Sequence, residues 1–437
     1  MLPTIATGNV GSALAGEYEV ANSLRFDGGS NDHLSKTPSS AGNRKTWTWS
    51  CWVKLGVFVN GTLFGVGTSS TEKTEIVMGG ITNTAGLNVR IRSDTGDGNK
   101  AVTTSAVHRD PSAWYHIVVA VDTTQATDSN RIKIYVNGSQ ETSFSSSSYP
   151  SQNVDTYVNS TNEHKIGTDV GETKDFSGYM AEVCFIDGQA LDPTSFGEFD
   201  SDTNIWKPID VSGLTFGTNG FYLDFENSGS LGADVSGNGN NFTVNNLTSI
   251  DQSTDTCTNN FAVLNALDNY YPDSTLSEGN TQTVIGAGDW TPIKATFGLT
   301  TGKWYWEIKH SAVSSGSSYA TIGIGSNQAT GNQQRGGVNS TDYSYWFNGE
   351  LRSNDSLQIS VNSYGVGDII GVALDLDNNN LYFSKNGTWQ NSSDPESGAT
   401  GTGAFSVTSP SSTPLGAYFP EVGFYDNTNT GTFQCNF

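Results

Sequence analysis

The chain has 437 residues, a length at which two domains are expected because single hydrophobic cores stop growing near ~250–300 residues. Its net charge of −23 excludes the cationic surface that nucleic-acid binding needs, and it opposes docking on anionic lipid. Aromatic residues reach 11%, which excludes a disordered chain, and 50 glycines accompany many Ser, Thr and Asn residues. This composition favours an all-β protein with many polar turns.

Residues 1–22 are small and polar and show no periodicity, so we expect an N-terminal arm or linker. They contain no positively charged segment followed by an apolar run, so they do not resemble a secretory signal. No stretch of the chain approaches the ~18 apolar residues that a membrane helix needs. We therefore expect a protein made in the cytoplasm, without membrane insertion, that reaches the outside by a route such as cell lysis.

Strand patterns fill the first half. Residues 23–36 predict a strand, a turn and a strand, and residues 46–55 ("TWTWSCWVKL") alternate between two faces with period two. Residues 113–122 ("AWYHIVVAVD") form a nearly continuous apolar run, which predicts a strand buried on both faces. The strand at 131–138 ("RIKIYVNG") ends in Asn-Gly, which favours a type I′ hairpin, and residues 175–191 predict the last clear strand of this half.

A polar stretch then separates this half from a second set of strands. Residues 192–254 begin with Asp, Ser, Thr and Gly, and we interpret them as a connector that starts the second sandwich. Alternation returns in residues 302–310 ("GKWYWEIKH"), and residues 367–387 repeat the strand-turn-strand design up to a second Asn-Gly pair. No window of ten or more residues has a sustained period of 3.6, so we expect very little helix. Many short strands with frequent turns predict sandwiches or jelly rolls.

The first set of strands resembles the laminin-G-like, concanavalin-like family. That family has a Trp-x-His pair before a strand ending in Asp, then a Tyr-Val-Asn-Gly hairpin, and later Gly-x-x-x-Glu-Val. The resemblance covers roughly residues 20–190 and implies a concanavalin-like β-sandwich. It is carried by Trp114, His116, Asp122, Tyr135, Asn137, Gly138, Gly178, Glu182 and Val183.

The second set resembles the SPRY family, over roughly residues 255–437. In that family a Gly-x-Trp/Tyr-Tyr-Trp-Glu strand precedes a Gly-Asp-x-Ile/Val-Gly-Val-x-Leu-Asp strand and an Asn-Gly hairpin. The match is carried by Gly302, Tyr305, Trp306, Glu307, Gly367, Asp368, Gly371, Val372, Leu374, Asp375, Asn386 and Gly387. The expected fold is therefore all-β, with two concanavalin-like jelly-roll β-sandwiches in tandem. The expected segments are an arm (1–22), a laminin-G-like sandwich (23–191), the connector (192–254) and a SPRY-like sandwich (255–437).

This pairing of domains, in an acidic and Asn/Gly/Ser/Thr-rich chain, is similar to virion structural proteins and tail fibres of marine bacteriophages. The resemblance implies a non-enzymatic virion protein, such as a tail fibre or spike that binds host glycan or receptor through sandwich loops. It also implies attachment to other virion proteins through the N-terminal arm, and a homo-oligomer such as a trimer. Two alternatives stay open: a capsid-decoration or head-fibre protein without a receptor role, and a carbohydrate-active enzyme.

We do not expect catalysis. Concanavalin-like glycosidases need two facing carboxylates, usually presented as Glu-x-Asp-x-x-Glu on one strand, and the chain has no such run. The nearest spacing is Glu182 with Asp187, and the family resemblance makes Glu182 structural. None of the five histidines accompanies a nucleophile elbow, and we interpret His116, inside the buried strand run, as a core histidine.

No Cys or His cluster has zinc spacing, but oxygen ligands for calcium are plentiful. The laminin-G-like resemblance implies a calcium ion at the sandwich rim, with Asp27, Asp32, Asp122 and Asp175 as candidate ligands. The alternative is that these residues cap tight turns. No cofactor is required.

The candidate ligand-binding surface is the stretch from Arg335 to Asp355, with Arg335, Tyr343, Tyr345 and Trp346 as its contact residues. Aromatic faces stack on sugar rings while polar groups bond the hydroxyls. The alternative is that Tyr345 and Trp346 fill the core of the SPRY-like sandwich, as alternating aromatics do in ordinary sheets.

Four cysteines are too few for a disulfide scaffold. Cys51 and Cys184 lie in apolar strand patterns, which predicts buried free thiols. Cys257 and Cys435 lie near the two ends of the second half, where the termini of a sandwich are often neighbours. A bridge between them stays open, although synthesis in the cytoplasm disfavours it.

Overall fold

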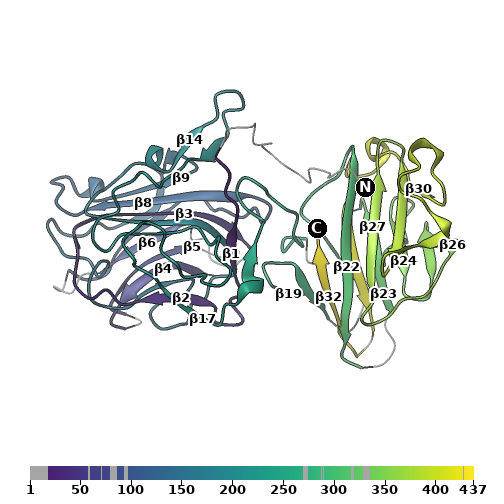
Figure 1. The fold of residues 1–437 in the computed structure, drawn as a ribbon, viewed down its shortest axis with the longest axis horizontal. Coiled ribbons are helices and arrows are strands. Elements are labelled where there is room, and N and C mark those ends of the chain that lie inside the picture. The colour runs from purple at the N-terminus through teal and green to yellow at the C-terminus, as the bar shows by residue number, and fades with distance from the viewer. Residues whose placement is uncertain are drawn as a thin grey trace. The chain divides into compact units, whose positions relative to one another are not determined.

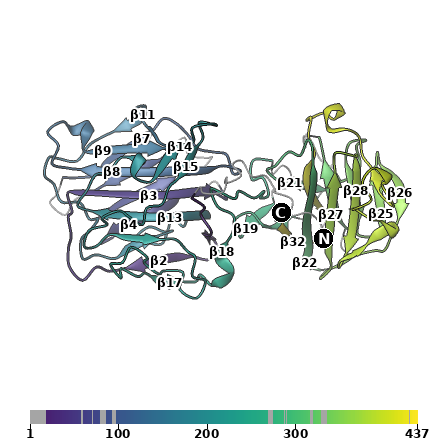
Figure 2. The same ribbon diagram turned by 45° about the horizontal axis from the view of Figure 1, so that its top comes forward.

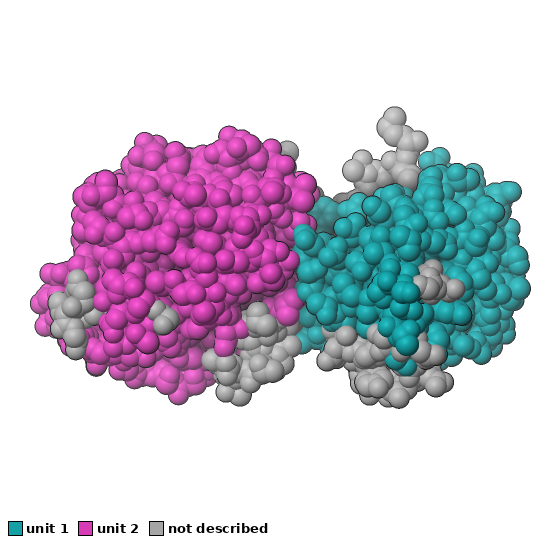
Figure 3. Space-filling model, turned by 90° about the horizontal axis from the view of Figure 1, so that it is seen from below, with its two compact units in different colours: residues 1–8, 261–437 teal, residues 9–260 magenta. Residues whose placement is uncertain are grey.

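The computed structural model describes residues 18–57, 60–69, 71–78, 86–92, 97–268, 274–286, 288, 290–315, 319–327, 335–426 and 428–437. Its described residues form two compact units that meet in the sequence at Asn260 and Phe261. We call the unit that ends at Asn260 the first unit (magenta, unit 2 in Figure 3) and the unit that starts at Phe261 the second unit (teal, unit 1 in Figure 3). Each unit contains two large β-sheets (Figures 1 and 2). The chain is an all-β protein with two β-sandwich domains, as the sequence predicts.

The first unit has two eight-stranded sheets and a small hairpin. One sheet contains β1 (Ser23–Phe26), β3 (Thr46–Leu55), β8 (Trp114–Asp122), β9 (Ile132–Val136), β10 (Ser139–Gln140), β13 (Gly178–Asp187), β16 (Phe221–Leu223) and β18 (Gln252–Ser253), in the order β10-β9-β8-β3-β13-β1-β18, with β16 also paired to β13. The other contains β2 (His33–Lys36), β4 (Gly61–Gly67), β5 (Lys73–Met78), β6 (Asn88–Ile91), β7 (Lys100–Thr104), β11 (Phe144–Ser147), β12 (His164–Ile166) and β17 (Thr243–Asn245), in the order β11-β7-β6-β5-β4-β12-β2-β17. The hairpin pairs β14 (Gly197–Phe199) with β15 (Trp206–Pro208).

The second unit also has two sheets. One contains β19 (Thr275–Ser277), β20 (Gln282–Ile285), β22 (Lys303–Val313), β27 (Ile369–Asp375), β28 (Asn380–Lys385), β29 (Thr388–Trp389), β30 (Phe405–Ser406) and β32 (Gly431–Asn436), in the order β19-β20-β32-β22-β27-β28-β29, with β30 also paired to β28. The other contains β21 (Thr291–Lys294), β23 (Tyr319–Gly325), β24 (Tyr343–Trp346), β25 (Glu350–Ser353), β26 (Ser356–Ser360) and β31 (Phe419–Tyr425), in the order β21-β31-β23-β24-β25-β26.

Helix is confined, in the described ranges, to six 3₁₀ turns of three residues. They are η1 (Asp128–Asn130), η2 (Pro193–Ser195), η3 (Ser249–Asp251), η4 (Gln390–Ser392), η5 (Gly398–Thr400) and η6 (Pro410–Ser412). The expectation of very little helix is confirmed for this part of the chain. None of these helices has the length and apolar character to cross a bilayer.

Large aromatic side chains fill the space between the sheets of the first unit. Trp49 on β3 stacks on Phe64 of β4 with ring centroids 6.3 Å apart, and Phe185 of β13 lies 6.0 Å from the same Phe64 ring. Such contacts join strands of opposite sheets, so the alternation read in residues 46–55 gives the inner face of β3.

Residues 192–254, the last part of the first unit, are placed differently from the prediction. Residues 192–254 do not start the second sandwich, because β16 pairs with β13, β17 with β2 and β18 with β1. One edge of β13 is shared: β1 covers residues 178–180 and β16 covers residues 183–185. Between them lies Glu182, at a bulge with φ +53°, which interrupts the ladder. The late strands are therefore the closing strands of the first sandwich.

The outer face of this sheet is buried as well. Val118 of β8 and Ile186 of β13 pack with Phe196, Val211 and Phe216, which belong to the returning segment. This packing confirms that β8 is buried on both faces.

His116, on the same face, accepts a hydrogen bond at Nδ1 from the Trp206 indole (2.9 Å), and its Nε2 contacts the Ser50 hydroxyl (2.9 Å). Its interpretation as a core histidine is thus confirmed. All four cysteines are free thiols, and Cys51 and Cys184 are buried as the sequence predicts.

A buried ion pair fixes the last segment of the first unit. The Lys54 ammonium is fully buried and contacts Asp255 Oδ2 (2.7 Å) and Asn260 Oδ1 (2.8 Å), while the Trp114 indole donates to Asp255 Oδ1 (3.1 Å). Residues 1–17 of the expected arm lie outside the described residues, but Tyr18 already hydrogen-bonds Glu182 (2.9 Å). The sandwich therefore begins earlier than residue 23 and ends later than residue 191.

Candidate functional site

A polar concavity of the first unit lies on the outer face of the β8–β9 sheet and has a volume of about 380 Å³. Such a volume is within the usual range for small-molecule sites. Alternation on β9 turns Lys133 and Tyr135 to this face and Ile134 to the core. We call the concavity the polar groove; it is lined by Ala120, Asp122, Gln125, Asn130, Lys133, Tyr135, Ala190, Leu191 and Asp192.

One wall of the polar groove, residues 122–130, is held by hydrogen bonds. The Arg131 guanidinium donates to the carbonyls of Gln125 (2.9 Å), Ala126 (2.9 Å) and Pro150 (2.8 Å). Asp122 accepts from the Thr124 backbone N (3.0 Å) and hydroxyl (2.6 Å), and from Gln125 Nε2 (2.5 Å). Burial by itself would raise the pKa of Asp122, but these hydrogen bonds hold it below the ordinary value. The wall is therefore preformed.

Other groups in the polar groove have no internal partner. In the part of the chain that the structure describes, neither the Lys133 ammonium, the Tyr135 hydroxyl nor the Asn130 amide makes a hydrogen bond or ion pair. Asp192 uses Oδ1 for the Thr194 backbone N (2.9 Å) and hydroxyl (2.5 Å), which leaves Oδ2. Gln125 likewise retains its Oε1. The groove thus offers an ammonium, a phenol, an amide and two acceptor oxygens to a ligand.

The electrostatics of the polar groove are mildly acidic. Its lining includes two carboxylates, Asp122 and Asp192, and one ammonium, Lys133. Burial, and after it the charge of Asp192, raises the pKa of the Tyr135 phenol, so this side chain is a neutral hydrogen-bond donor at ordinary pH. These donors and acceptors allow the groove to bind and orient hydroxyl groups.

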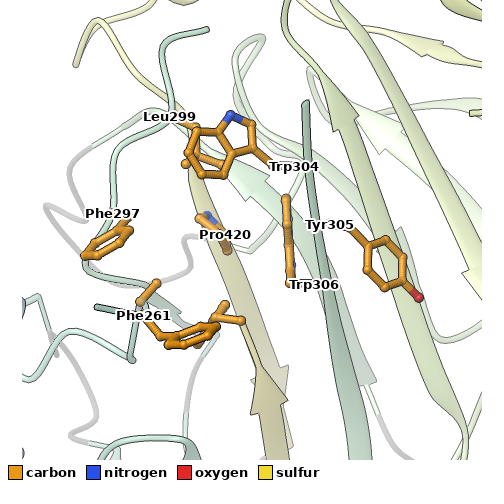
Figure 4. A pocket seen from close by; sticks show the side chains of 9 residues that line it. Phe261, Phe297, Leu299, Trp304, Tyr305, Trp306 and Pro420 are labelled. Atoms are coloured by element: carbon orange, nitrogen blue, oxygen red, sulfur yellow. The ribbon is translucent and has the colours of Figure 1, made fainter. Parts of the chain in front are cut away.

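The second unit contains an apolar pocket with a cavity volume of only about 30 Å³. A space of this size holds one or two water-sized groups, so a saccharide does not fit in it. Figure 4 shows Phe261, Phe297 and Trp304 around the cavity, while the Tyr305 ring points away from it. The full lining is Phe261, Ala262, Phe297, Leu299, Trp304, Tyr305, Trp306, Pro420 and Phe437.

The predicted ligand residues of the second unit are mostly buried. Tyr343, Tyr345 and Trp346 are 5%, 0% and 8% exposed, which agrees with the alternative that they belong to the core. Trp346 lies beneath two guanidinium groups, with Arg335 at 5.4 Å and Arg352 at 4.8 Å from its ring. Arg335 also pairs with Asp355 at 2.7 Å. Arg335 therefore lies over Trp346, whereas Tyr343 and Tyr345 point to the opposite face of β24. The buried rings leave little surface for a ligand.

Three of the predicted calcium ligands lie near one another at one rim. A Cβ at Gly28 would lie 3.2 Å from the Asp175 carbonyl oxygen, which places the Asp27 loop beside Asp175. Asp27 accepts from the Gly29 backbone N (3.1 Å), and Asp32 accepts from the Asp27 backbone N (2.9 Å). These bonds are turn contacts. Asp122 lies instead in the polar groove, and the described residues contain no group of three or more His, Cys, Asp or Glu side chains arranged for a metal.

Acidic side chains also converge on the outer face of the second sheet of the first unit. Glu75 and Asp169 both contact the Lys73 ammonium, and Glu75 also pairs with Arg90 (2.7 Å) and Lys174 (2.8 Å). Glu75, Asp169 and Lys73 are all buried. The arrangement is an ion-pair network, and neither carboxylate faces solvent.

The sequence did not predict the polar groove. The period of two in "RIKIYVNG" predicts that Lys133 and Tyr135 share one strand face, and Asp122 is expected only as a calcium ligand. No sequence pattern indicates that Asn130 and Asp192 belong to this site. They approach Tyr135 only when the β8–β9 loop and the segment after β13 fold onto the sheet.

Comparison with known families gives each unit a class. Residues 27–194 match the model described as the concanavalin A-like lectin/glucanases superfamily, and residues 303–435 match the SPRY domain. The chain therefore carries a laminin-G-like, concanavalin-like domain followed by a SPRY domain. A comparison with curated proteins finds no match.

Two solved structures illustrate the likeness. The SPRY domain of human HERC1 is 18% identical, with 37% of this chain and 91% of that chain covered and a TM-score of 0.29. A heptameric SAP-like pentraxin from Limulus polyphemus is 17% identical, with 40% and 79% covered and a TM-score of 0.30. Scores at this level carry no functional argument.

Proposed function

We propose that the chain is a non-enzymatic adhesin of a bacteriophage virion, a tail fibre or spike that binds a cell-surface glycan through the polar groove. The observation that carries the binding role is the set of unpartnered hydrogen-bonding groups on a preformed wall, at Asn130, Lys133, Tyr135 and Asp192. Hydroxyl-rich ligands suit such a set because each hydroxyl both donates and accepts. The two domain classes, which suggest binding roles, support the same proposal.

The virion assignment rests on other grounds. It is supported by the resemblance to marine bacteriophage fibre proteins that the acidic, Gly/Ser/Thr/Asn-rich sequence and its two domain types suggest. On this proposal the N-terminal residues attach the chain to other virion proteins, and the chain forms a homo-oligomer such as a trimer. A capsid-decoration or head-fibre role is the alternative location, and a carbohydrate-active enzyme is the alternative activity.

Two experiments test the proposal. Full-length protein applied to a glycan array and to bacterial cells should bind a restricted set of glycans, and the Tyr135→Phe variant should bind about five- to tenfold more weakly. Antibody labelling of virions viewed by electron microscopy should mark the tail. Labelling confined to the capsid shell, or no glycan and no cell binding, would reject the adhesin.

A further inference from the structure

The hydrogen-bonding groups left open in the polar groove differ in sign and in kind. Lys133 only donates, Asp192 Oδ2 and Gln125 Oε1 only accept, and Asn130 and Tyr135 can do both. A ligand that satisfies all of them must offer donors and acceptors together at neighbouring positions. A sulfate or carboxylate group only accepts, so where it replaces a hydroxyl group it can bond Lys133 but cannot donate to Asp192 or Gln125.

The charges around the polar groove also favour a neutral ligand. Two carboxylates and one ammonium line the polar groove, and the whole chain carries a net charge of −23. An anionic ligand would approach against this field, and its contact with Lys133 would be offset by repulsion from Asp192. A neutral polyol meets no such repulsion, and its hydroxyl groups can bond the ammonium and the carboxylate at the same time.

From this complementarity we infer that the polar groove selects neutral saccharides over sulfated or uronic ones. This inference rests on the proposed glycan-binding function and adds the ligand class. Lys133 acts as a donor to sugar hydroxyls, and Asp192 acts as both an acceptor and the group that excludes anions. The selection operates through one face of β9 and the segment that follows β13.

Asp192 can be tested cleanly because of its local geometry. Its Oδ1 caps the turn of η2 by accepting from the Thr194 backbone N and hydroxyl, and an Asn side chain can accept the same bonds. Asp192→Asn therefore removes the charge and keeps the cap. Asp110 caps Ser112 in the same way, through its backbone N (2.8 Å) and hydroxyl (2.5 Å), and it does not line the groove. Asp110→Asn is the matched control.

Lys133 has a matched control in the second unit. Lys309 is an exposed strand lysine with no hydrogen bond or ion pair among the described residues, so Lys309→Gln changes net charge equally, far from the polar groove in sequence and in a different unit. Lys133→Gln keeps a donor at the position but removes the positive charge. For a neutral ligand this change should cost at most about threefold in affinity.

The experiment uses the full chain on an array that prints each glycan backbone in neutral, uronic and sulfated forms, with dextran and dextran sulfate as one matched pair. The inference predicts binding to neutral members that changes by less than about twofold between 20 and 500 mM NaCl. Asp192→Asn should gain about three- to fivefold for the sulfated partner of any bound backbone, and Asp110→Asn should gain nothing.

Three outcomes are distinguishable. Neutral binding with these variant effects supports both the function and the ligand class. Preferential binding of sulfated or uronic members that collapses in Lys133→Gln but not in Lys309→Gln overturns the ligand class and leaves the glycan-binding function standing. No binding to any printed or cellular glycan overturns the proposed function, and the ligand class falls with it.

Discussion

Asn137 and His116 exchange two hydrogen bonds across the β8–β9 hairpin. The Asn137 backbone N donates to the His116 carbonyl, and the His116 backbone N donates to Asn137 Oδ1, both at 2.8 Å. Asn386 and Ile369 repeat this exchange in the second unit, at 2.8 and 2.9 Å. The φ angles also agree, at +47° and +76° for Asn137-Gly138 and +49° and +78° for Asn386-Gly387. The Asn of each Asn-Gly pair therefore ties the turn to the adjacent strand, β8 or β27, in addition to adopting a positive φ.

The two turn glycines differ in their surroundings, which makes them a matched pair. A Cβ at Gly138 would lie 2.3 Å from the Trp206 ring, whereas a Cβ at Gly387 would meet nothing within 4 Å. Both substitutions to Ala should cost about 1–2 kcal/mol for the left-handed backbone. Gly138→Ala should cost a further ~1–3 kcal/mol because Trp206 must shift. Hydrogen exchange of each unit in the full chain measures the two costs, and equal costs would contradict this packing.

The Lys54–Asp255 pair should hold the end of the first unit in place. Asp255→Ala leaves the Lys54 ammonium buried without its carboxylate, so the first unit should lose about 3–5 kcal/mol of unfolding free energy in urea. Desolvation already lowers the pKa of Lys54, and Asp255 is the group that opposes this shift. Asp355→Ala is the control, because its pair with Arg335 is at the surface and should contribute no more than about 1 kcal/mol. Similar losses of unfolding free energy in Asp255→Ala and Asp355→Ala would show that the buried pair does not hold the end of the first unit in place.

His116 should make the first unit sensitive to acid. Burial lowers its pKa to about 3, and because the indole of Trp206 can only donate, His116 must keep Nδ1 unprotonated. The unfolded chain, with an ordinary histidine pKa of 6.5, binds more protons than the folded chain between these values. Stability should therefore fall as the pH drops from about 6.5 toward 3. Nitrogen NMR should find the His116 ring neutral, with its proton on Nε2, down to about pH 4; titration near pH 6.5 would contradict this.

Two buried carboxyls act in the opposite sense, so a variant is needed to isolate His116. Burial raises the pKa of Glu182, in the first unit, to about 7 from an ordinary 4.5, and it does the same for Glu421, which affects only measurements that include the second unit. Their folded forms hold protons that the unfolded chain has lost, so this contribution to stability falls as the pH rises from 4.5 to 7. The difference in pH slope between the natural chain and His116→Gln removes these shared contributions. The slope with increasing pH should be less positive in the variant.

Much of the architecture was predictable because it depends on local periodicity. The alternation in "TWTWSCWVKL" gives β3, the apolar run gives β8, and each Asn-Gly pair gives its hairpin. The placement of residues 192–254 could not be predicted. β16 pairs with the part of β13 beyond Glu182 that β1 leaves unpaired. This pairing depends on the register between strands that are distant in sequence, which the periodicity of a single segment does not reveal.

The candidate functional site, like the fold, could be predicted from the sequence only in part. Tyr345 and Trp346 have the residue types of a sugar platform, but Tyr345 lies in the core and Trp346 lies beneath Arg335 and Arg352, so both rings are buried. The polar groove combines the outer face of β8 and β9 with two loops that are distant from each other in sequence, so only residues on the same strand could be placed together beforehand.

The most direct test of binding without bond cleavage uses a cell-surface polysaccharide incubated with the full chain, with binding and polymer size measured in the same sample. The account predicts saturable, reversible binding that weakens in Tyr135→Phe, together with an unchanged size distribution and no new reducing ends. Shortened polymer that accumulates with time would contradict it.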